Sequence, residues 1–472
     1  MTELSRWQFA TTSIYHFLFV PVTIGLAFLV ALLQTAWHRS LRWGGDPVYR
    51  RLTKFFGTLL LINVAIGVVT GLIQEFEFGM NWSAYSRFVG DVFGGPLAME
   101  GLAAFFLEST FLGLWIFGWN RLPRPIHLAC IWMVSLGTIL SAMFIMAANS
   151  WMQHPVGYTI NPQTHQAQLT DIWALFTNPV FYWGYLHVIM ASIVTGALVM
   201  LAVSAWHLRK RHQVHAFRKT ATLSLVVLLP AAALVMFFGG RLGINETKYQ
   251  PMKIAAAEGQ WNTCQPCSFS AFQIGGGNND QNPDLIIPIP HLLSILATGT
   301  WNGKVEGMNQ VQAQYVKQYG PGSYVPIVFI QYWGMRVMAY LGALIFLFAL
   351  WGAYLGIRRR LDRSKWFQRV AIYAVVAPFL MTIAGWLLTE NGRQPWIVQG
   401  LMRTTQGVSP SVSSTEVWIS LIAFASIYIV LGAADGYLMI RYGRKALEEE
   451  PEAEDAREEK QPEGADVPAI VY

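Results

Sequence analysis

The chain has 472 residues, of which 54% are hydrophobic and only 13% are charged, and its mean hydropathy is +0.37. Soluble domains carry about a quarter charged residues, so this composition excludes an ordinary soluble protein and indicates one that crosses a lipid bilayer several times. The formal net charge of +6 does not indicate nucleic-acid binding, because the basic residues gather in short segments between apolar runs.

Nine apolar runs are long enough to cross about 30 Å of hydrocarbon, which needs about 20 helical residues. They cover residues 14–36, 55–76, 96–118, 127–150, 181–206, 220–240, 325–357, 368–390 and 416–440. The sequence therefore predicts an all-α, polytopic integral membrane bundle of nine transmembrane helices. The first run lacks a small-residue cleavage site, so we expect it to be retained as a span.

Lys and Arg are concentrated in every second connection between these runs. Because cytoplasmic loops carry the excess of basic residues, we expect the N-terminus outside and the C-terminus in the cytoplasm. The chain then divides into spans one to six, an extracytoplasmic loop, spans seven to nine, and an acidic cytoplasmic tail that we expect to be disordered. These segments are 1–240, 241–324, 325–440 and 441–472.

Four residues that can bind iron fall in the outer half of the membrane, on four different spans. His16 lies near the outer start of the first, His187 about two turns into the fifth, and Met338 three to four turns into the seventh. Glu390 closes the eighth. This is the arrangement expected for haems held within a bundle, although each residue alone also fits a hydrogen-bonded histidine, a core methionine or a solvated acid. The residues alone indicate a redox or transport site near the outer face.

Two carboxylates of the third span lie on roughly one helical face, since Glu100 and Glu108 are eight residues apart. Carboxylates inside a membrane favour an ion or proton path, with a buried structural pair as the alternative. Ser141 of the fourth span can add a hydroxyl to such a path, although a serine here also fits helix packing.

The central loop contains a cation and a carboxylate, Lys253 and Glu258, on an otherwise small and apolar stretch. They can hold the oxygens of a quinol and take its protons, or they can be ordinary solvated charges. The same loop contains Cys264-Gln-Pro-Cys267, which is at most half a zinc site. A local disulfide and two free thiols both remain open for this pair.

Several longer motifs are specific. They are Glu3-Leu-Ser-Arg-Trp-Gln-Phe-Ala, Tyr15-His16-Phe-Leu-Phe-Val, Gly79-Met-Asn-Trp82, Gly95-Pro-Leu-Ala-Met-Glu100 continuing to Glu108-Ser-Thr, Trp151-Met-Gln, Met335-Arg336-Val-Met338, and Glu390-Asn-Gly-Arg393-Gln-Pro-Trp396. Together they resemble subunit I of cytochrome bd, the quinol oxidase of bacterial respiratory chains. The resemblance covers nearly all of residues 3–440 and agrees with nine spans and an external N-terminus.

The resemblance implies two haem b groups and one haem d. His187 and Met338 would be the axial ligands of a low-spin haem b, and Arg336 supports Met338 over Met335 because the family pattern is Arg-x-Met. His16 would ligate one high-spin haem and Glu390 the other. Haem d is preferred on His16, but the two places are not distinguished by the sequence. Arg393 and Trp396 would contact this haem pair, the arginine by neutralising propionates.

The resemblance also implies the reaction. Quinol would be oxidised near the outer face with help from Lys253 and Glu258, and dioxygen would be reduced to water without copper. Protons would arrive from the cytoplasm along Glu100, Glu108 and Ser141, so charge would be separated without a pump. The family resides in the bacterial cytoplasmic membrane and implies a second large membrane subunit, with small accessory subunits undetermined. The choice between ubiquinol and menaquinol stays open, and the cysteine pair belongs to no motif of the family.

Two other classes of protein fit the residues without the resemblance. One is a haem b membrane anchor that passes electrons between quinone and a dehydrogenase. The other is a haem-free ion or solute transporter that uses Glu100 and Glu108 and leaves His16 and His187 as core residues. An absorbance spectrum of the purified protein distinguishes the three, because only the oxidase has a red-shifted chlorin band that responds to oxygen or carbon monoxide.

Overall fold

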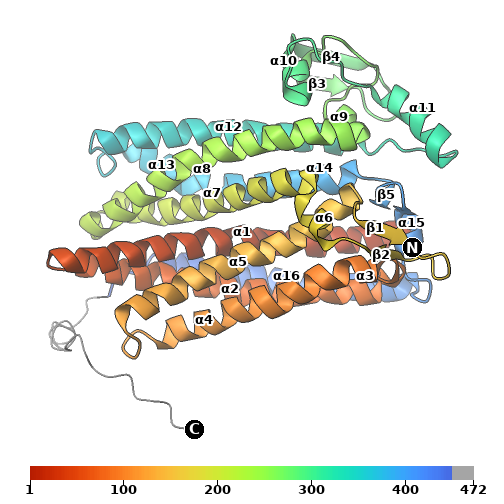
Figure 1. Ribbon diagram of the computed structural model, residues 1–472. Coiled ribbons are helices and arrows are strands. Elements are labelled where there is room, and N and C mark those ends of the chain that lie inside the picture. The colour runs from red at the N-terminus through yellow and green to blue at the C-terminus, as the bar shows by residue number, and fades with distance from the viewer. Residues whose placement is uncertain (449–472) are drawn as a thin grey trace, which may run out of the picture.

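The computed structural model describes residues 1–448, so most of the acidic tail expected over 441–472 lies outside the described residues. Within them, nine helices are long and apolar enough to cross a membrane, which confirms the predicted bundle. Figure 1 shows these helices lying side by side along one direction. They are α1 (Thr2–Ser40), α2 (Pro47–Met80), α3 (Ser83–Met99) continued by the π-helical turn η2 (Glu100–Phe105) and α4 (Phe106–Phe117), α5 (Arg124–Gln153), α7 (Pro179–Lys210), α8 (Val214–Tyr249), α12 (Val328–Ile357), α13 (Lys365–Ala374) continued by α14 (Val376–Gly392), and α16 (Ser414–Gly443).

Most of these helices are longer than the apolar runs that predict them, and α2, α7 and α16 each begin at a side chain that caps the first turn. Asp46 caps α2 by accepting a hydrogen bond from the backbone of Val48 at 3.1 Å. The seventh spanning helix begins at Val328, where Asn278 accepts its N–H, and not at residue 325. The sixth, α8, runs on to Tyr249, beyond the boundary expected at residue 240.

The smaller elements gather at the end of the bundle that holds the N-terminus, which we call the loop end (Figure 1). They form three antiparallel strand pairs and several short helices. The strand pairs are β1 (Tyr158–Ile160) with β2 (Ala167–Leu169), β3 (Phe269–Gly275) with β4 (Pro283–Ile289), and β5 (Trp396–Val398) with β6 (Met402–Arg403). The helices are α6 (Ile172–Thr177), α9 (Pro251–Ala257), α10 (Leu292–Thr298), α11 (Met308–Tyr319) and α15 (Thr404–Gly407), while the 3₁₀ turn η1 (Leu41–Trp43) follows α1 at the opposite end.

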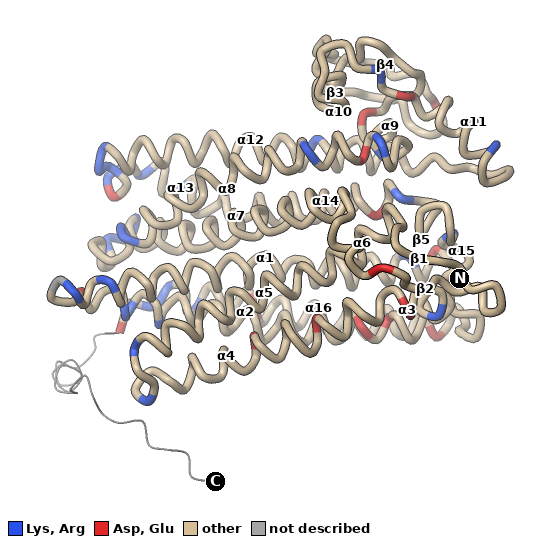
Figure 2. The backbone as a smooth tube through the Cα atoms, in the orientation of Figure 1, with Lys and Arg blue, Asp and Glu red and all other residues tan. Residues whose placement is uncertain are grey.

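Charge is distributed unequally between the two ends of the bundle. Figure 2 shows Lys and Arg gathered at the end opposite the N-terminus, where α1 leads into α2, α7 into α8 and α12 into α13. Asp and Glu are more frequent toward the loop end. This is the asymmetry from which the sequence predicts a cytoplasmic basic end. The placement of the N-terminus outside and the C-terminus in the cytoplasm stays a prediction.

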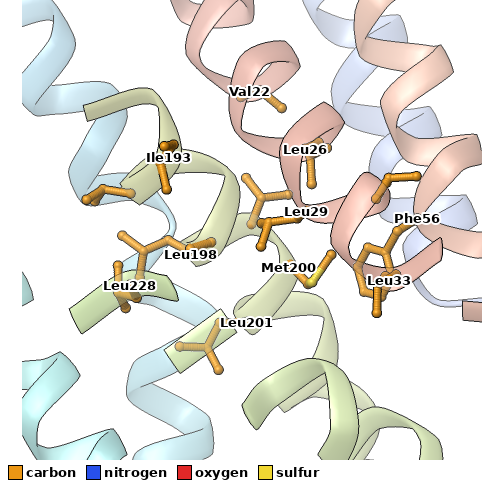
Figure 3. Packing of buried hydrophobic residues seen from close by; sticks show 14 of the residues in the cluster. Val22, Leu26, Leu29, Leu33, Phe56, Ile193, Leu198, Met200, Leu201 and Leu228 are labelled. Carbon is orange, nitrogen blue, oxygen red and sulfur yellow. The ribbon is translucent and has the colours of Figure 1, made fainter. Parts of the chain in front are cut away.

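The core of the bundle is built by α1, α2, α7 and α8. Leu26 and Leu29 of α1 and Met200 of α7 belong to one buried apolar cluster with Phe56 of α2 and Leu228 of α8 (Figure 3). Of the nine spanning helices in the described residues, α7 is the most enclosed, whereas α16 and the span made by α3, η2 and α4 are among the least. The central helices therefore hold the peripheral ones in place.

The backbones of α1 and α7 touch at a pair of glycines. A Cβ added at Gly25 would lie 2.3 Å from the carbonyl oxygen of Ser192, and one at Gly196 would lie 2.4 Å from the backbone of Gly25. Small residues at a crossing allow two membrane helices to pack backbone to backbone. His16 and His187 each lie nine residues before the glycine of their own helix.

Gly25→Ala should destabilise the folded subunit, because the neighbouring atom is backbone and cannot move aside cheaply. Overpacking of this kind costs about 1–3 kcal/mol. We expect a lower midpoint of thermal unfolding for the detergent-purified complex. Gly90→Ala on α3 is the control, since a Cβ there meets nothing within 4 Å and alanine favours the helix. Equal midpoints for the two variants would contradict the close contact.

Candidate functional site

A cavity of about 680 Å³ lies among α1, α2, the span α3–η2–α4, α5 and α14. Its volume falls in the range of about 300–1,000 Å³ that is usual for cofactor pockets. Its lining is mainly apolar but includes six residues that the sequence predicts for the site. They are His16, Glu100, Glu108, Ser141, Glu390 and Arg393. Residues from five spans thus meet around one space.

His16 and Glu390 enter this cavity from different helices. His16 of α1 uses Nδ1 to contact the Thr70 hydroxyl of α2 at 3.0 Å. Glu390, in the last turn of α14, accepts a hydrogen bond from Asn149 of α5 at 3.1 Å and forms an ion pair with Arg393. Within residues 1–448, no three His, Cys, Asp or Glu side chains gather as a metal cluster, so these candidate iron ligands act singly from separate helices.

Arg393 indicates what the cavity accepts. Its side chain is only 5% exposed, and its Nε and Nη1 have no hydrogen-bond partner among the described residues. Buried guanidinium donors are normally paired, and a planar fork fits a carboxylate or similar anion. Because Arg393 borders the cavity, the propionate of a haem is a group that would satisfy it. The residues present therefore fit a haem.

Trp396, also expected at the haem pair, is not among the residues that line this cavity. It stacks on Tyr324 with ring centroids 5.7 Å apart, and its indole Nε1 is buried without a partner in the described part of the chain. Trp396 borders a second space of about 10 Å³, together with Lys253 and Arg393. That volume is close to the minimum for one water molecule. Trp396 thus lies at the loop end, outside the lining of the cavity and beside Lys253 and Arg393.

The three residues predicted for a proton path are brought together. The Ser141 hydroxyl donates to the Glu100 carboxylate at 2.7 Å, and Glu100 and Glu108 border the same cavity. The turn from Glu100 to Phe105 is π-helical, a form found mostly at functional sites in helices. Glu75 of α2 borders the cavity as well. Glu75 was not among the predicted residues, although an acid near the end of the second apolar run was a visible signal.

His187 and Met338 lie apart from this cavity, on α7 and α12, which both pack against α8. His187 donates from Nδ1 to the backbone carbonyl of Val235 at 2.9 Å. Since a carbonyl only accepts, Nε2 keeps its lone pair for a metal. A Cβ at Gly239 would lie 3.0 Å from the His187 ring, and one at Gly385 would lie 3.3 Å from the Met338 sulfur. Glycines therefore provide the space around both predicted ligands.

Lys253 and Glu258 lie on α9 and at its C-terminal cap, and each is buried in a separate ion pair. The Lys253 ammonium donates to Glu246 of α8 at 2.9 Å and to Gln153 of α5 at 2.7 Å. Burial lowers the pKa of Lys253, and the Glu246 carboxylate opposes that change. Glu246 and Gln153 were not predicted, because only the fold brings them to the loop.

Glu258 pairs with Arg336 of α12 at 2.8 Å, and both side chains are almost fully buried, at 4% and 1% exposed. Burial raises the pKa of Glu258, while Arg336 lowers it. Arg336 also donates to the carbonyl of Ser270 at 2.7 Å and lies over the Tyr332 ring at 3.8 Å. The residue two positions before Met338 therefore ties that helix to the central loop.

Cys264 and Cys267 form a disulfide, which resolves the alternative that the sequence leaves open. Cys267 is buried in a small apolar cluster with Phe269 and Val305. The backbone of Cys264 also pairs with that of Val305. The disulfide therefore closes the segment that leads into β3, the strand that contains Ser270.

A nine-helix membrane bundle with single imidazole, carboxylate and thioether groups around apolar space has the ligand set of a membrane haem protein. The chain matches the family model described as cytochrome bd terminal oxidase subunit I over residues 4–447, and it belongs to that family. It is 46% identical over 446 residues to the cytochrome bd ubiquinol oxidase subunit 1 of Bacillus subtilis (strain 168). The alignment covers 94% of this chain and 94% of the relative.

Two further relatives agree. The cytochrome bd-II ubiquinol oxidase subunit 1 of Escherichia coli (strain K12) is 34% identical, over 94% of this chain and 96% of the relative. The structure of bd oxidase from Geobacillus thermodenitrificans superposes with a TM-score of 0.84 at 28% identity, covering 94% of this chain and 98% of that chain. The fold and the sequence thus lead to the same family.

Membership makes the chain subunit I of a bd-type quinol oxidase, a quinol:oxygen oxidoreductase of the bacterial cytoplasmic membrane. It implies haem cofactors and a second subunit. It decides against the two other classes that fit the residues, the haem b anchor and the haem-free transporter.

Glu258→Gln should change how stability depends on pH. The folded pKa of Glu258 is raised above the ordinary value of about 4.3, so its contribution to stability is full below that pH and is lost as the pH rises through the folded pKa. Glutamine does not titrate, so the thermal midpoint should depend less on pH over this window. It should also be lower, because breaking a buried ion pair costs about 3–5 kcal/mol.

Glu306→Gln, in the same loop and outside the Arg336 pair, is the control, and it should keep the parent profile. The measurement is thermal unfolding of the purified complex between pH 4 and pH 9, roughly the range that brackets carboxyl titration. A Glu258→Gln profile parallel to that of the parent would show that this carboxyl does not contribute to the pH dependence.

Proposed function

We propose that the oxidase containing this chain oxidises quinol at the loop end and reduces dioxygen to water without copper, using two haem b groups and one haem d. One observation carries the proposal. The cavity brings His16 and Glu390 to the same space as Glu100, Glu108 and Ser141. Two single iron ligands and a set of proton-carrying groups thus share one chamber.

His187 and Met338 would hold the low-spin haem b, and His16 and Glu390 the two high-spin haems, with haem d preferred on His16. Support comes from the bare Nε2 of His187, the glycines beside both low-spin ligands, and the unpaired donors of Arg393. When bound, haem supplies one-electron transfer and, where only one protein ligand is present, an open iron position for dioxygen. Arg393 would neutralise a propionate, while Trp396 would support the turn that carries Arg393.

Lys253 and Glu258 would bind the two ends of the quinol. The buried Glu258 carboxyl, with its raised pKa, suits a group that accepts a proton from a quinol hydroxyl. Lys253 would orient a quinol oxygen through its ammonium protons, exchanging one of its present partners Glu246 and Gln153. Both released protons would leave on the extracytoplasmic side.

Protons for the reduction of dioxygen would come from the cytoplasmic side and be held by Glu108, Glu100 and Ser141 beside the cavity. The Ser141–Glu100 hydrogen bond supports such a relay. Quinol protons would be released outside, on the side of the N-terminus. Protons taken from the cytoplasm and moved through the membrane to the cavity would therefore separate charge without a pump. The wall formed by α3, η2 and α4 is little enclosed, so the second large subunit on this face would shield the cavity from lipid.

His187→Ala and Met338→Leu should each abolish the low-spin haem signal in the reduced-minus-oxidised absorbance spectrum, because each would remove one of the two residues that would hold that haem. Met335→Leu is the matched control on the same helix, and it should retain the full signal. The protein should still be present in the membrane, as measured by its yield. A low-spin signal that survives in both variants would overturn this ligand assignment.

Glu108→Gln should slow oxygen consumption by about 10²-fold while haem content stays at the parent level, since a positioned proton carrier contributes about 10²–10⁴-fold. Ser109→Ala is the control, because Ser109 neighbours Glu108 but does not border the cavity. The measurement is oxygen uptake with excess quinol, normalised to haem. A rate equal to that of the control would remove Glu108 from the proton route.

A further inference from the structure

The hydrogen bond at His16 determines which ring nitrogen carries the proton. The Thr70 hydroxyl donates its single proton to the carbonyl of Gly67 at 2.9 Å. Toward His16 Nδ1, 3.0 Å away, this hydroxyl can then only accept. Nδ1 must therefore bear the hydrogen, and Nε2 is left with its lone pair. This is the tautomer that a metal bound through Nε2 requires.

The next residue of α2 determines where the ring lies. A Cβ added at Gly71 would lie 2.9 Å from Cε1 of His16 and 3.4 Å from Nε2. The ring therefore rests directly on the backbone of α2, and any side chain at position 71 would push it away. Thr70 and Gly71 together fix both the tautomer and the position of the imidazole.

Helix α16 fixes this part of α2 in turn. Tyr428, which is 2% exposed, donates its hydroxyl proton to the backbone carbonyl of Thr70 at 3.1 Å. The Tyr428 ring stacks on Tyr15, the neighbour of His16, with centroids 4.4 Å apart. Tyr15 also donates a hydrogen bond to the Tyr428 carbonyl. The histidine and its acceptor are thus held by the same third helix.

Other histidines of the chain can be compared with this arrangement. His187 also donates from Nδ1 to an oxygen of a neighbouring helix and also rests on a glycine, Gly239. His127, by contrast, has partners at both ring nitrogens, Gln34 at 2.8 Å and the carbonyl of Trp115 at 2.8 Å. A ring bonded at both nitrogens has none left for a metal. His207 and His291 also have one ring nitrogen bonded to a backbone carbonyl, His207 through Nε2 and His291 in the exposed central loop. What His16 and His187 share is a bond from Nδ1 to an oxygen of a neighbouring helix together with a glycine against the ring.

We propose that Thr70 and Gly71 are positioning residues for the iron ligand His16. The inference rests on the proposed function, in which His16 binds a high-spin haem. A hydrogen bond from Nδ1–H makes an imidazole a stronger donor to its metal, which strengthens the iron–nitrogen bond and stabilises the oxidised iron. Thr70 therefore sets the redox potential of that haem, and Gly71 sets its occupancy.

The test uses the whole purified complex and two readouts besides turnover: the iron–histidine stretching band in the resonance Raman spectrum, and the midpoint potential of the high-spin haem proposed to be held by His16. Thr70→Val removes the hydroxyl and keeps the shape, which leaves the ring with the Gly67 carbonyl alone as an acceptor. The band should therefore shift to lower frequency and the potential should become more positive. Thr70→Ser keeps the oxygen and should restore both. Thr58→Val on the same helix is the control, because the Thr58 hydroxyl bonds only within α2, to Lys54.

Gly71→Ala should lower the occupancy of the His16 haem, measured as high-spin haem per low-spin haem, and the low-spin signal reports that the subunit is folded. If Thr70→Val has the same iron–histidine band and the same midpoint potential as the Thr58→Val control, the proposed role of Thr70 is overturned. Identical behaviour of the serine and valine variants would overturn it as well. Full occupancy with an unshifted band in Gly71→Ala would overturn the role of Gly71.

His16→Ala separates this inference from the proposed function. Loss of the iron–histidine band in His16→Ala, together with an unchanged band in Thr70→Val, would leave His16 as the ligand and reject the positioning role. A band that persists in His16→Ala would reject His16 as the ligand, and the inference would fall with it.

Discussion

The contact between α1 and α7 at Gly25 and Gly196 is the constraint on which the rest of the site depends. The first and fifth spans run in the same direction, and each carries its histidine nine residues before the glycine. At 1.5 Å per residue, both imidazoles therefore lie about 14 Å from the crossing, at the same depth. The helix α7, the most enclosed of the nine found in the described residues, thus sets the depth of both histidines proposed as haem ligands.

A second constraint joins the loop end to the spans. Lys253 and Glu258 lie on one short element, yet their partners Glu246 and Arg336 belong to two different spanning helices. Removing either partner would leave a buried charge uncompensated, which is more costly than the net value of the pair. The loop is therefore held rigidly on the spans by buried charges. Arg336 in particular connects Glu258, a residue proposed to bind quinol, to the helix of Met338.

The bundle was predictable from the sequence because lipid demands long apolar helices, and that demand is visible in composition alone. The candidate ligands were selected by their depth, but the choice of Met338 over Met335 needed the resemblance to a family. Thr70, Asn149 and Glu246 could not be assigned, because their roles arise from helices that are distant in sequence and adjacent in space. Trp396 was expected at the haems. Its place beside Tyr324 follows from the short strand β5, which no hydrophobic pattern in the sequence predicts.

The large cavity among α1, α2, α3–η2–α4, α5 and α14 also bears on how the cell maintains this protein. Side chains fill most membrane bundles, whereas a prosthetic group bound in this cavity would take the place of core residues. A group that binds only the folded chain adds its binding free energy to folding, so the stability of the subunit rises and falls with the haem supply. Under haem limitation the cell would lose the polypeptide itself to proteolysis, and its abundance would follow haem synthesis without any dedicated regulator.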